Sequence, residues 1–332
     1  MVCGLVLGLA ACGGDDGAGG GASGGSAGQG GSSAAGGSGA GGSGAQGGSG
    51  AQGGAGGSGA AGGSGGGVGE WTQLMAGDWS LDAGDEGYEC VLFTVPEDMF
   101  VAGFRPIAPA GTHHTVLTRE ESASQPDGVY PCDAGTNGPN MIYGSGVGTE
   151  PLEFPPGVAI KLAKGERLLL NLHLFNVTPK GITGTSGIEV YRLAEDDVEH
   201  EAEMVLAGKD QGLTVETGET TQTGRCTMTG DTTVFAVLPH MHQLGTHMKV
   251  TAELPGGDQT LLDTDYSFDE QKYVVQDPTV SLSQGTRLRV DCTYYNDRGE
   301  TVYFGDSSLA EMCYAGTYRY PKLGTSSIFC TQ

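Results

Sequence analysis

The stretch TRLRVDCTYY, residues 286–295, shows the pattern that decides the fold class. Its apolar residues Leu288, Val290 and Cys292 alternate with arginine and aspartate. Because successive side chains of a β-strand point to opposite faces, this alternation predicts a strand with one buried face.

Similar short runs recur through the rest of the chain, and proline- and glycine-rich turns separate them. They cover residues 90–95, 115–118, 167–177, 187–192, 233–238, 248–254 and 315–320. The one weak helical pattern covers residues 193–206. We therefore predict an all-β fold with two consecutive β-sandwich, jelly-roll-like domains, at residues 71–195 and 196–332.

The first 70 residues have a different composition. After Cys12 the chain continues mainly in glycine, serine and alanine to about Gly69, with no aromatic residue. Such a segment cannot bury enough apolar surface to offset the entropy lost on ordering. Residues 12–70 are therefore predicted to be a disordered tether, and the 62 glycines do not indicate a fibrous protein because no strict Gly-X-Y period exists.

Charge and cysteine content exclude two classes of protein. The net charge of −24, from 40 acidic and 16 basic residues, argues against nucleic acid as a partner. Six of the eight cysteines lie in the predicted folded region, and no two of them form a CxxC pair. An even number without that spacing favours disulfides over a cysteine-rich zinc site.

His240 and His242 follow a strand-like run in the sequence FAVLPHMHQLG. Residues i and i+2 of a strand share a face, so the two imidazoles can bind one metal ion. Solvated surface histidines give the same pattern. A cupin site also contains such a pair, but it adds a glutamate a few residues later, and residues 243–250 contain none.

Three further histidines interrupt strand-like runs. His113 and His114 are adjacent in PAGTHHTVL, and His173 lies in RLLLNLHLFNV. Neighbours on a regular strand face opposite sides, so joint metal binding by the adjacent pair requires irregular geometry. A lone core histidine is usually structural, whereas several such features in one chain favour ligands. His200 and His247 lack comparable support and are expected to be bystanders.

Four motifs carry a family resemblance. In chain order, GTHHTVL, LNLHLFN, PHMHQLG and AEMCYAG resemble the copper type II, ascorbate-dependent monooxygenases. That family includes peptidylglycine alpha-hydroxylating monooxygenase and dopamine beta-monooxygenase. The resemblance extends from about Trp79 to Cys330.

The resemblance implies two copper ions per chain, held by different ligands. An electron-transfer copper would be held by His113, His114 and His173. A second copper, where O₂ and substrate meet, would be held by His240, His242 and Met312. Thioether sulfur stabilises Cu(I), and imidazole supports both oxidation states. The resemblance also implies three disulfides, Cys90–Cys132, Cys226–Cys330 and Cys292–Cys313.

Two positions depart from the peptide-amidating member of the family. Leu238 stands where that enzyme has a basic residue for the substrate carboxylate, and Gly316 stands where it has a substrate-side tyrosine. The identity of the substrate, which could be a small molecule or a peptide, therefore cannot be transferred from the known family members to this chain. The expected function is hydroxylation of a C–H bond with O₂ and a one-electron reductant such as ascorbate. The alternatives are a non-catalytic copper-binding or copper-handling surface lipoprotein with the same fold, and an adhesion module with one structural metal.

Residues 9–12, LAAC, resemble a bacterial lipobox. The apolar run that ends there is too short to span a bilayer. The resemblance implies that residues 1–11 are a lipoprotein signal peptide and that Cys12 carries the lipid. We therefore expect an exported bacterial lipoprotein, monomeric and held by its lipid on the periplasmic side or at the cell surface.

Overall fold

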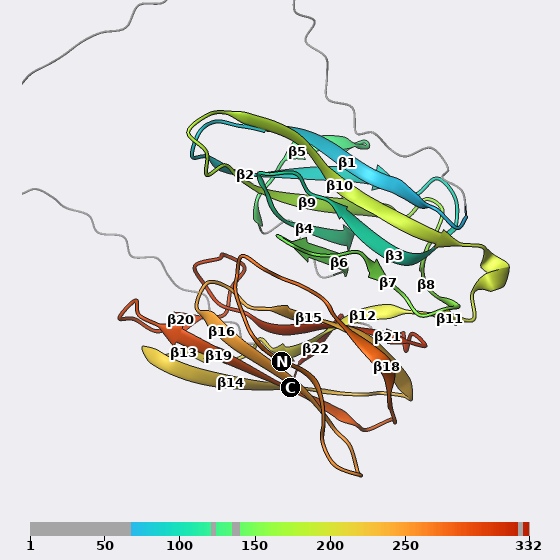
Figure 1. Ribbon diagram of the computed structural model, residues 1–332, viewed down its shortest axis with the longest axis vertical. Helices are drawn as coiled ribbons and strands as arrows, with labels where there is room; N and C mark the ends of the chain where they lie inside the picture. Colours follow the sequence, from blue (N-terminus) through green and yellow to red (C-terminus); the bar gives the residue numbers. More distant parts are fainter. Residues whose placement is uncertain (1–67, 121–123, 135–139, 325–327, 332) are drawn as a thin grey trace, which may run out of the picture. The chain divides into compact units, whose positions relative to one another are not determined.

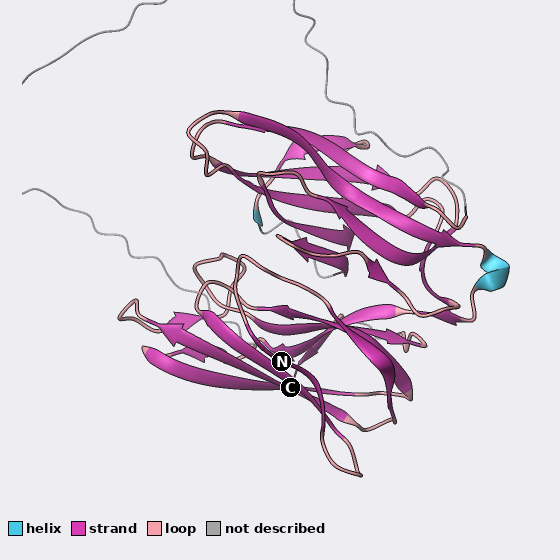
Figure 2. Cartoon of the chain, viewed as in Figure 1, coloured by secondary structure: helices cyan, strands magenta, loops and turns pink. Residues whose placement is uncertain are grey.

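The computed structural model describes residues 68–331, except residues 121–123, 135–139 and 325–327. These residues belong to one compact unit of the chain, Ala55–Gln332. Strands form almost all of its regular structure (Figure 2), which confirms the predicted all-β, sandwich-like fold. The predicted signal peptide, Cys12 and nearly all of the predicted tether lie outside the described residues. Among the residues that are described, no helix is both long and apolar enough to cross a membrane.

The first part of the chain forms two sheets, whose strands are labelled in Figure 1. One sheet has the order β1-β10-β3-β8-β11, with β7 paired to β3. Its strands are β1 (Trp71–Leu81), β10 (Ile182–Leu193), β3 (Met99–Ile107), β8 (Val158–Leu162), β11 (His200–Glu201) and β7 (Leu152–Glu153). The other has the order β5-β2-β9-β4-β6. It contains β5 (Gly128–Pro131), β2 (Glu86–Thr94), β9 (Arg167–Phe175), β4 (Thr112–Arg119) and β6 (Met141–Gly146).

The later part of the chain forms three more sheets. The order β18-β15-β21-β12-β22 joins β18 (Val274–Leu282), β15 (Thr232–His240), β21 (Cys313–Tyr320), β12 (Glu203–Lys209) and β22 (Phe329–Thr331). The order β14-β19-β16-β17 joins β14 (Gly218–Thr227), β19 (Arg287–Asn296), β16 (Gly245–Glu253) and β17 (Gln259–Asp265). β13 (Thr214–Val215) pairs with β20 (Val302–Tyr303). The alternating stretch at residues 286–295 forms β19, where Leu288, Val290 and Cys292 are fully buried.

The weak helical pattern at residues 193–206 does not correspond to an α-helix. That stretch contains the end of β10, the short 3-10 helix η2 (Glu195–Asp197), β11 and the start of β12. The three acidic residues of η2 bury nothing, whereas Ala202 and Met204 are buried on either side of the half-buried Glu203, which is the period of a strand. β11 lies beyond residue 196 but pairs with β8. The division into domains 71–195 and 196–332 stays a prediction.

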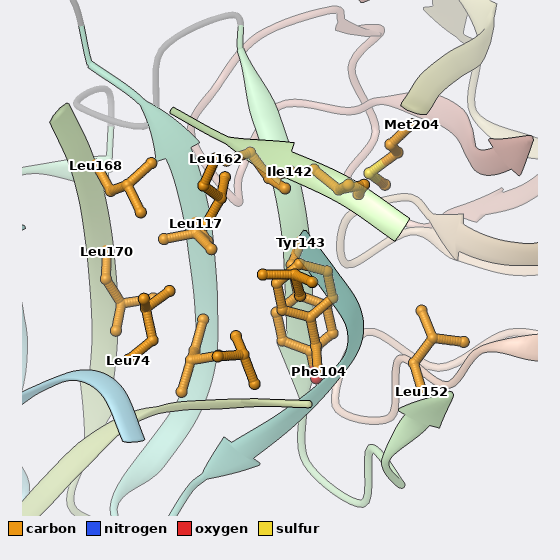
Figure 3. Packing of buried hydrophobic residues seen from close by; sticks show 14 of the residues in the cluster. Leu74, Phe104, Leu117, Ile142, Tyr143, Leu152, Leu162, Leu168, Leu170 and Met204 are labelled. Carbon is orange, nitrogen blue, oxygen red and sulfur yellow. The ribbon is translucent and has the colours of Figure 1, made fainter. Parts of the chain in front are cut away.

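One buried core connects strands from both parts of the chain. Figure 3 shows Phe104 and Tyr143 stacked beside leucines of β4 and β9, and the two ring centroids are 4.8 Å apart. The same core includes Met204 of β12 and Tyr318 of β21. The Tyr318 hydroxyl donates to the Ile142 carbonyl of β6 at 2.6 Å. A second core fills the space between the sheets of the later part.

The described residues contain three disulfides, Cys90–Cys132, Cys226–Cys330 and Cys292–Cys313. They are the pairings that the family resemblance implies. Cys313 is the first residue of β21 and Cys292 lies within β19, so this bond fixes the strand that begins directly after Met312.

Candidate metal centres

The first candidate centre contains His113 and His114 of β4 and His173 of β9. A register irregularity between β4 and β9 falls between Thr112 and His114, and this is the departure from regular geometry that an adjacent pair requires. The Nδ1 atom of His114 lies 3.0 Å from Nδ1 of His113 and 3.2 Å from Nδ1 of His173. One ligand nitrogen from each residue lies within 4.8 Å of the other two. The three imidazoles can therefore meet at one ion.

Carboxylates orient two of these imidazoles. Nε2 of His173 lies 2.6 Å from Oε1 of Glu86, and Nε2 of His113 lies 3.2 Å from Oδ1 of Asp269. Because a carboxylate only accepts hydrogen bonds, each Nε2 is the donor, and each Nδ1 keeps its lone pair for a metal. The Tyr88 ring stacks on His173 with centroids 4.4 Å apart.

Burial favours the neutral form of His114 and His173. It lowers the pKa of His114 well below its usual range, and the neighbouring His173 and His113 lower that pKa further. Burial also lowers the pKa of His173, although the hydrogen bond to Glu86 opposes the shift. An unprotonated imidazole is the form that binds metal, so both side chains are in their binding form at neutral pH.

The second candidate centre begins where β15 ends. His240 is the last residue of β15 and His242 lies just beyond it, so the two do not share one strand as the sequence predicted. Their rings still converge, with centroids 5.3 Å apart at 87°. Nδ1 of His240 lies 3.0 Å from Oε1 of Gln271, and Nδ1 of His242 lies 3.2 Å from the Ala310 carbonyl. With Nδ1 donating in each case, Nε2 is left free on both rings.

Burial acts on the second pair as well. It lowers the pKa of His240, against the opposing hydrogen bond to Gln271. Burial, together with the neighbouring His240, lowers the pKa of His242 to about 3. Met312 directly precedes β21 and lines the same cavity as both histidines.

Glu311 is a residue of this centre that the sequence did not reveal. It is fully buried, and its carboxylate accepts hydrogen bonds from the backbone N–H groups of His242 at 2.9 Å, Leu244 at 2.7 Å and Met312 at 3.3 Å. It thereby joins the segment after β15 to the segment before β21. Burial raises its pKa to about 7, although these backbone N–H groups lower it in part.

Residues 266–273, between β17 and β18, contact both centres. The Phe268 ring lies 5.4 Å from the His113 ring and 6.1 Å from the His242 ring, centroid to centroid. The same segment supplies the carboxylate that binds His113 and the amide oxygen that binds His240. No sequence pattern marked this segment, because its contacts are to residues distant in the chain.

A cavity of about 390 Å³ adjoins the second centre. Its lining includes His240, His242 and Met312, and also His114 from the first centre. The remaining wall is mainly apolar. Both predicted ligand groups therefore contribute to a single cavity.

The two histidines expected to be bystanders have other contacts. His200 stacks on Tyr320 with centroids 5.4 Å apart, and Nε2 of His247 lies 3.0 Å from Asp263. Within the described part of the chain, neither belongs to a cluster of three or more histidine, cysteine or acidic side chains that could hold a metal.

Comparison with known proteins agrees with these motifs. The model of the copper type II ascorbate-dependent monooxygenase C-terminal domain matches residues 198–332. Human DBH-like monooxygenase protein 1 is 26% identical over 72% of this chain and 45% of its own length. Human putative DBH-like monooxygenase protein 2 is 25% identical over 73% of the chain and 55% of its length. The chain thus spans about half the length of these curated relatives.

Solved structures add nothing to the assignment. The match to the infectious bursal disease virus VP2 subviral particle covers 74% of this chain and 70% of the VP2 chain, at 10% sequence identity. Its TM-score of 0.21 is too low to carry an argument. The ordered motifs, the domain match and the relatives agree with one another. Residues 198–332 match the C-terminal domain of the copper type II ascorbate-dependent monooxygenase family, and the relatives support that family for the chain.

Proposed function

We propose that this protein is a copper-dependent monooxygenase that hydroxylates a C–H bond of a small substrate with O₂ and a one-electron reductant such as ascorbate. The observation that carries the proposal is the pair of unlike donor groups, one of which lines an apolar cavity. Bound copper would supply one-electron redox chemistry and the activation of O₂.

The donor atoms fit copper. His113, His114 and His173 would hold one ion through nitrogen alone, and that set supports both Cu(I) and Cu(II). His240, His242 and Met312 would hold a second ion. The soft thioether there favours Cu(I), the oxidation state that reacts with O₂. The lowered pKa of His114 and of His242 keeps each imidazole unprotonated at neutral pH.

The two groups of metal ligands would have different roles in the reaction. The overall reaction consumes O₂, two electrons and two protons; one oxygen atom enters the C–H bond as a hydroxyl group and the other leaves as water. The three-histidine group would receive the electrons. His240, His242 and Met312 would direct the reaction into the cavity, whose apolar wall excludes water from it.

The cellular setting is part of the proposal. A lipid on Cys12 and a flexible tether over residues 12–70 would hold a monomeric catalytic unit away from the membrane of an exported bacterial lipoprotein. Disulfides form in oxidising compartments, so the three disulfides support a location outside the cytoplasm, where the copper sites would be loaded.

Copper stoichiometry measured together with ascorbate-dependent O₂ uptake tests the proposal. Two coppers per chain and uptake stimulated by a substrate support the enzyme. Two coppers without turnover on a broad substrate panel would instead indicate the non-catalytic copper-binding protein, and a single copper would indicate a structural site.

Replacement of the thioether tests the second centre. Met312→Ile should abolish turnover and leave the three-histidine group loaded. Met99→Ile, the same change in a buried position of β3, is the matched control and should retain turnover. Unchanged turnover in Met312→Ile would refute the role given to that residue.

A further inference from the structure

The wall of the cavity beside the second centre is apolar around Leu238. This residue is 3% exposed and lies between Gly144 and Gly316. A Cβ atom added to Gly316 would meet the Met204 Cε at 2.3 Å, and one added to Gly144 would meet the Met141 Cε at 2.5 Å. Methionine methyl groups therefore occupy the space above both glycines. Because methionine is unbranched and flexible, this wall can adapt to an apolar guest.

Three buried polar side chains of the wall, Thr115, Ser145 and Gln271, have hydrogen-bond partners within the protein. The hydroxyls of Thr115 and Ser145 lie 2.8 Å apart. Both polar atoms of the Gln271 side chain have hydrogen-bond partners. Its oxygen accepts from Nδ1 of His240, and its nitrogen donates to the Phe268 carbonyl at 3.4 Å. These groups therefore do not offer a charged ligand a free partner.

No lysine or arginine lines the cavity in the described part of the chain. The one carboxylate is Asp306, and it is exposed to solvent. Away from the metal ligands, an anion would lose its hydration without a lysine or arginine as a counter-charge, and this transfer is unfavourable. A cation would find only a solvated carboxylate, which contributes little to binding.

We infer that the substrate is a neutral, predominantly apolar small molecule. The cavity of about 390 Å³ is within the range of small-molecule sites, and its wall adjoins the ligands of the second centre. This inference rests on the proposed function, because it names the substrate class of the same site. Carboxylates and ammonium ions of the same carbon skeleton are discriminated against by the wall.

Three probes with one skeleton test this selectivity. They are 4-phenylbutan-1-ol, 4-phenylbutanoate and 4-phenylbutan-1-amine, titrated calorimetrically into the full-length protein without reductant, so that no turnover occurs. The alcohol is expected to bind at least about tenfold more tightly than either ion. Binding is read independently of catalysis, and copper stoichiometry and O₂ uptake on the same preparation report separately on the proposed function.

Two variants place a cation in the wall. Leu238→Arg introduces it at the buried centre, and Phe329→Lys introduces it at a position that is 37% exposed, where folding is less at risk. Each should tighten binding of the carboxylate at least about tenfold and weaken binding of the alcohol. Val177→Lys adds the same charge at a residue that is 79% exposed and is not part of the cavity wall, and it should leave all three affinities unchanged.

The outcomes separate clearly. Preference for the alcohol in the natural chain, reversed by a cation in the wall, supports the inference. Equal or tighter binding of the carboxylate or the amine to the natural chain overturns it, and so does the absence of measurable binding of the alcohol. Selectivity in Phe329→Lys identical to that in Val177→Lys also overturns it.

Discussion

Two tyrosine hydroxyls connect the later part of the chain to β6, and removing one of them should lower the free energy of unfolding measurably. Tyr318 is fully buried and donates to the Ile142 carbonyl at 2.6 Å, while Tyr273 donates to the Gly144 carbonyl at 2.8 Å. Tyr318→Phe deletes one oxygen atom and leaves the ring packing unchanged. The loss leaves the buried Ile142 carbonyl without this donor, and such an unmade bond costs about 1–3 kcal/mol.

Urea unfolding measures this cost. With a slope of about 3 kcal/mol per molar urea, the midpoint should fall by roughly 0.3–1 M, with the slope unchanged. Tyr303→Phe is the matched control, because Tyr303 is 63% exposed. A double-mutant cycle with Tyr273→Phe then reports whether the two hydroxyls act together. A Tyr318→Phe midpoint equal to that of Tyr303→Phe would refute the reasoning.

Three further predictions concern the metal centres and one close backbone contact. Glu86→Gln should weaken Cu(II) binding at the three-histidine group about 10–100-fold in chelator competition, with the exposed Glu150→Gln unchanged. Glu311→Ala should weaken Cu(I) binding at the second centre about tenfold or more and spare the first; equal weakening at both would contradict its position. Gly224→Ala should lower the free energy of unfolding, measured by urea denaturation, by about 3 kcal/mol, because the added Cβ would lie 2.1 Å from the backbone of β12. Gly256→Ala adds its Cβ in open space and should leave that free energy unchanged.

The strands could be predicted from the sequence because their signal is local. Residues 286–295 alternate along the chain itself, and the observed strand, Arg287–Asn296, differs by one residue at each end. The weak helical pattern at residues 193–206 shows the limit of such local signals. Its apolar residues are compatible with a weak helical pattern, but Met204 pairs with Tyr318 of β21 and the Ala202 N–H donates to the Ala159 carbonyl, so tertiary contacts outweigh local propensity.

The candidate ligands were recognised because histidine pairs and the motif around Met312 are visible as letters. Their supporting residues were not. Glu311 acts on His242 and Leu244, which are 69 and 67 residues away, and Asp269 acts on His113 across 156 residues. Nothing local distinguishes a glutamate that accepts buried backbone N–H groups from one on the surface. Only the fold brings these partners together.

Residues 266–273 have a thermodynamic consequence, because one segment contacts both histidine groups. If an ion at either group restricts this segment, part of the ordering cost is already met when the second ion binds. Linkage then requires reciprocity: whatever factor the first ion imposes on the affinity of the second group, an ion at the second imposes on the first. A copper titration would give the same coupling factor whichever group is filled first.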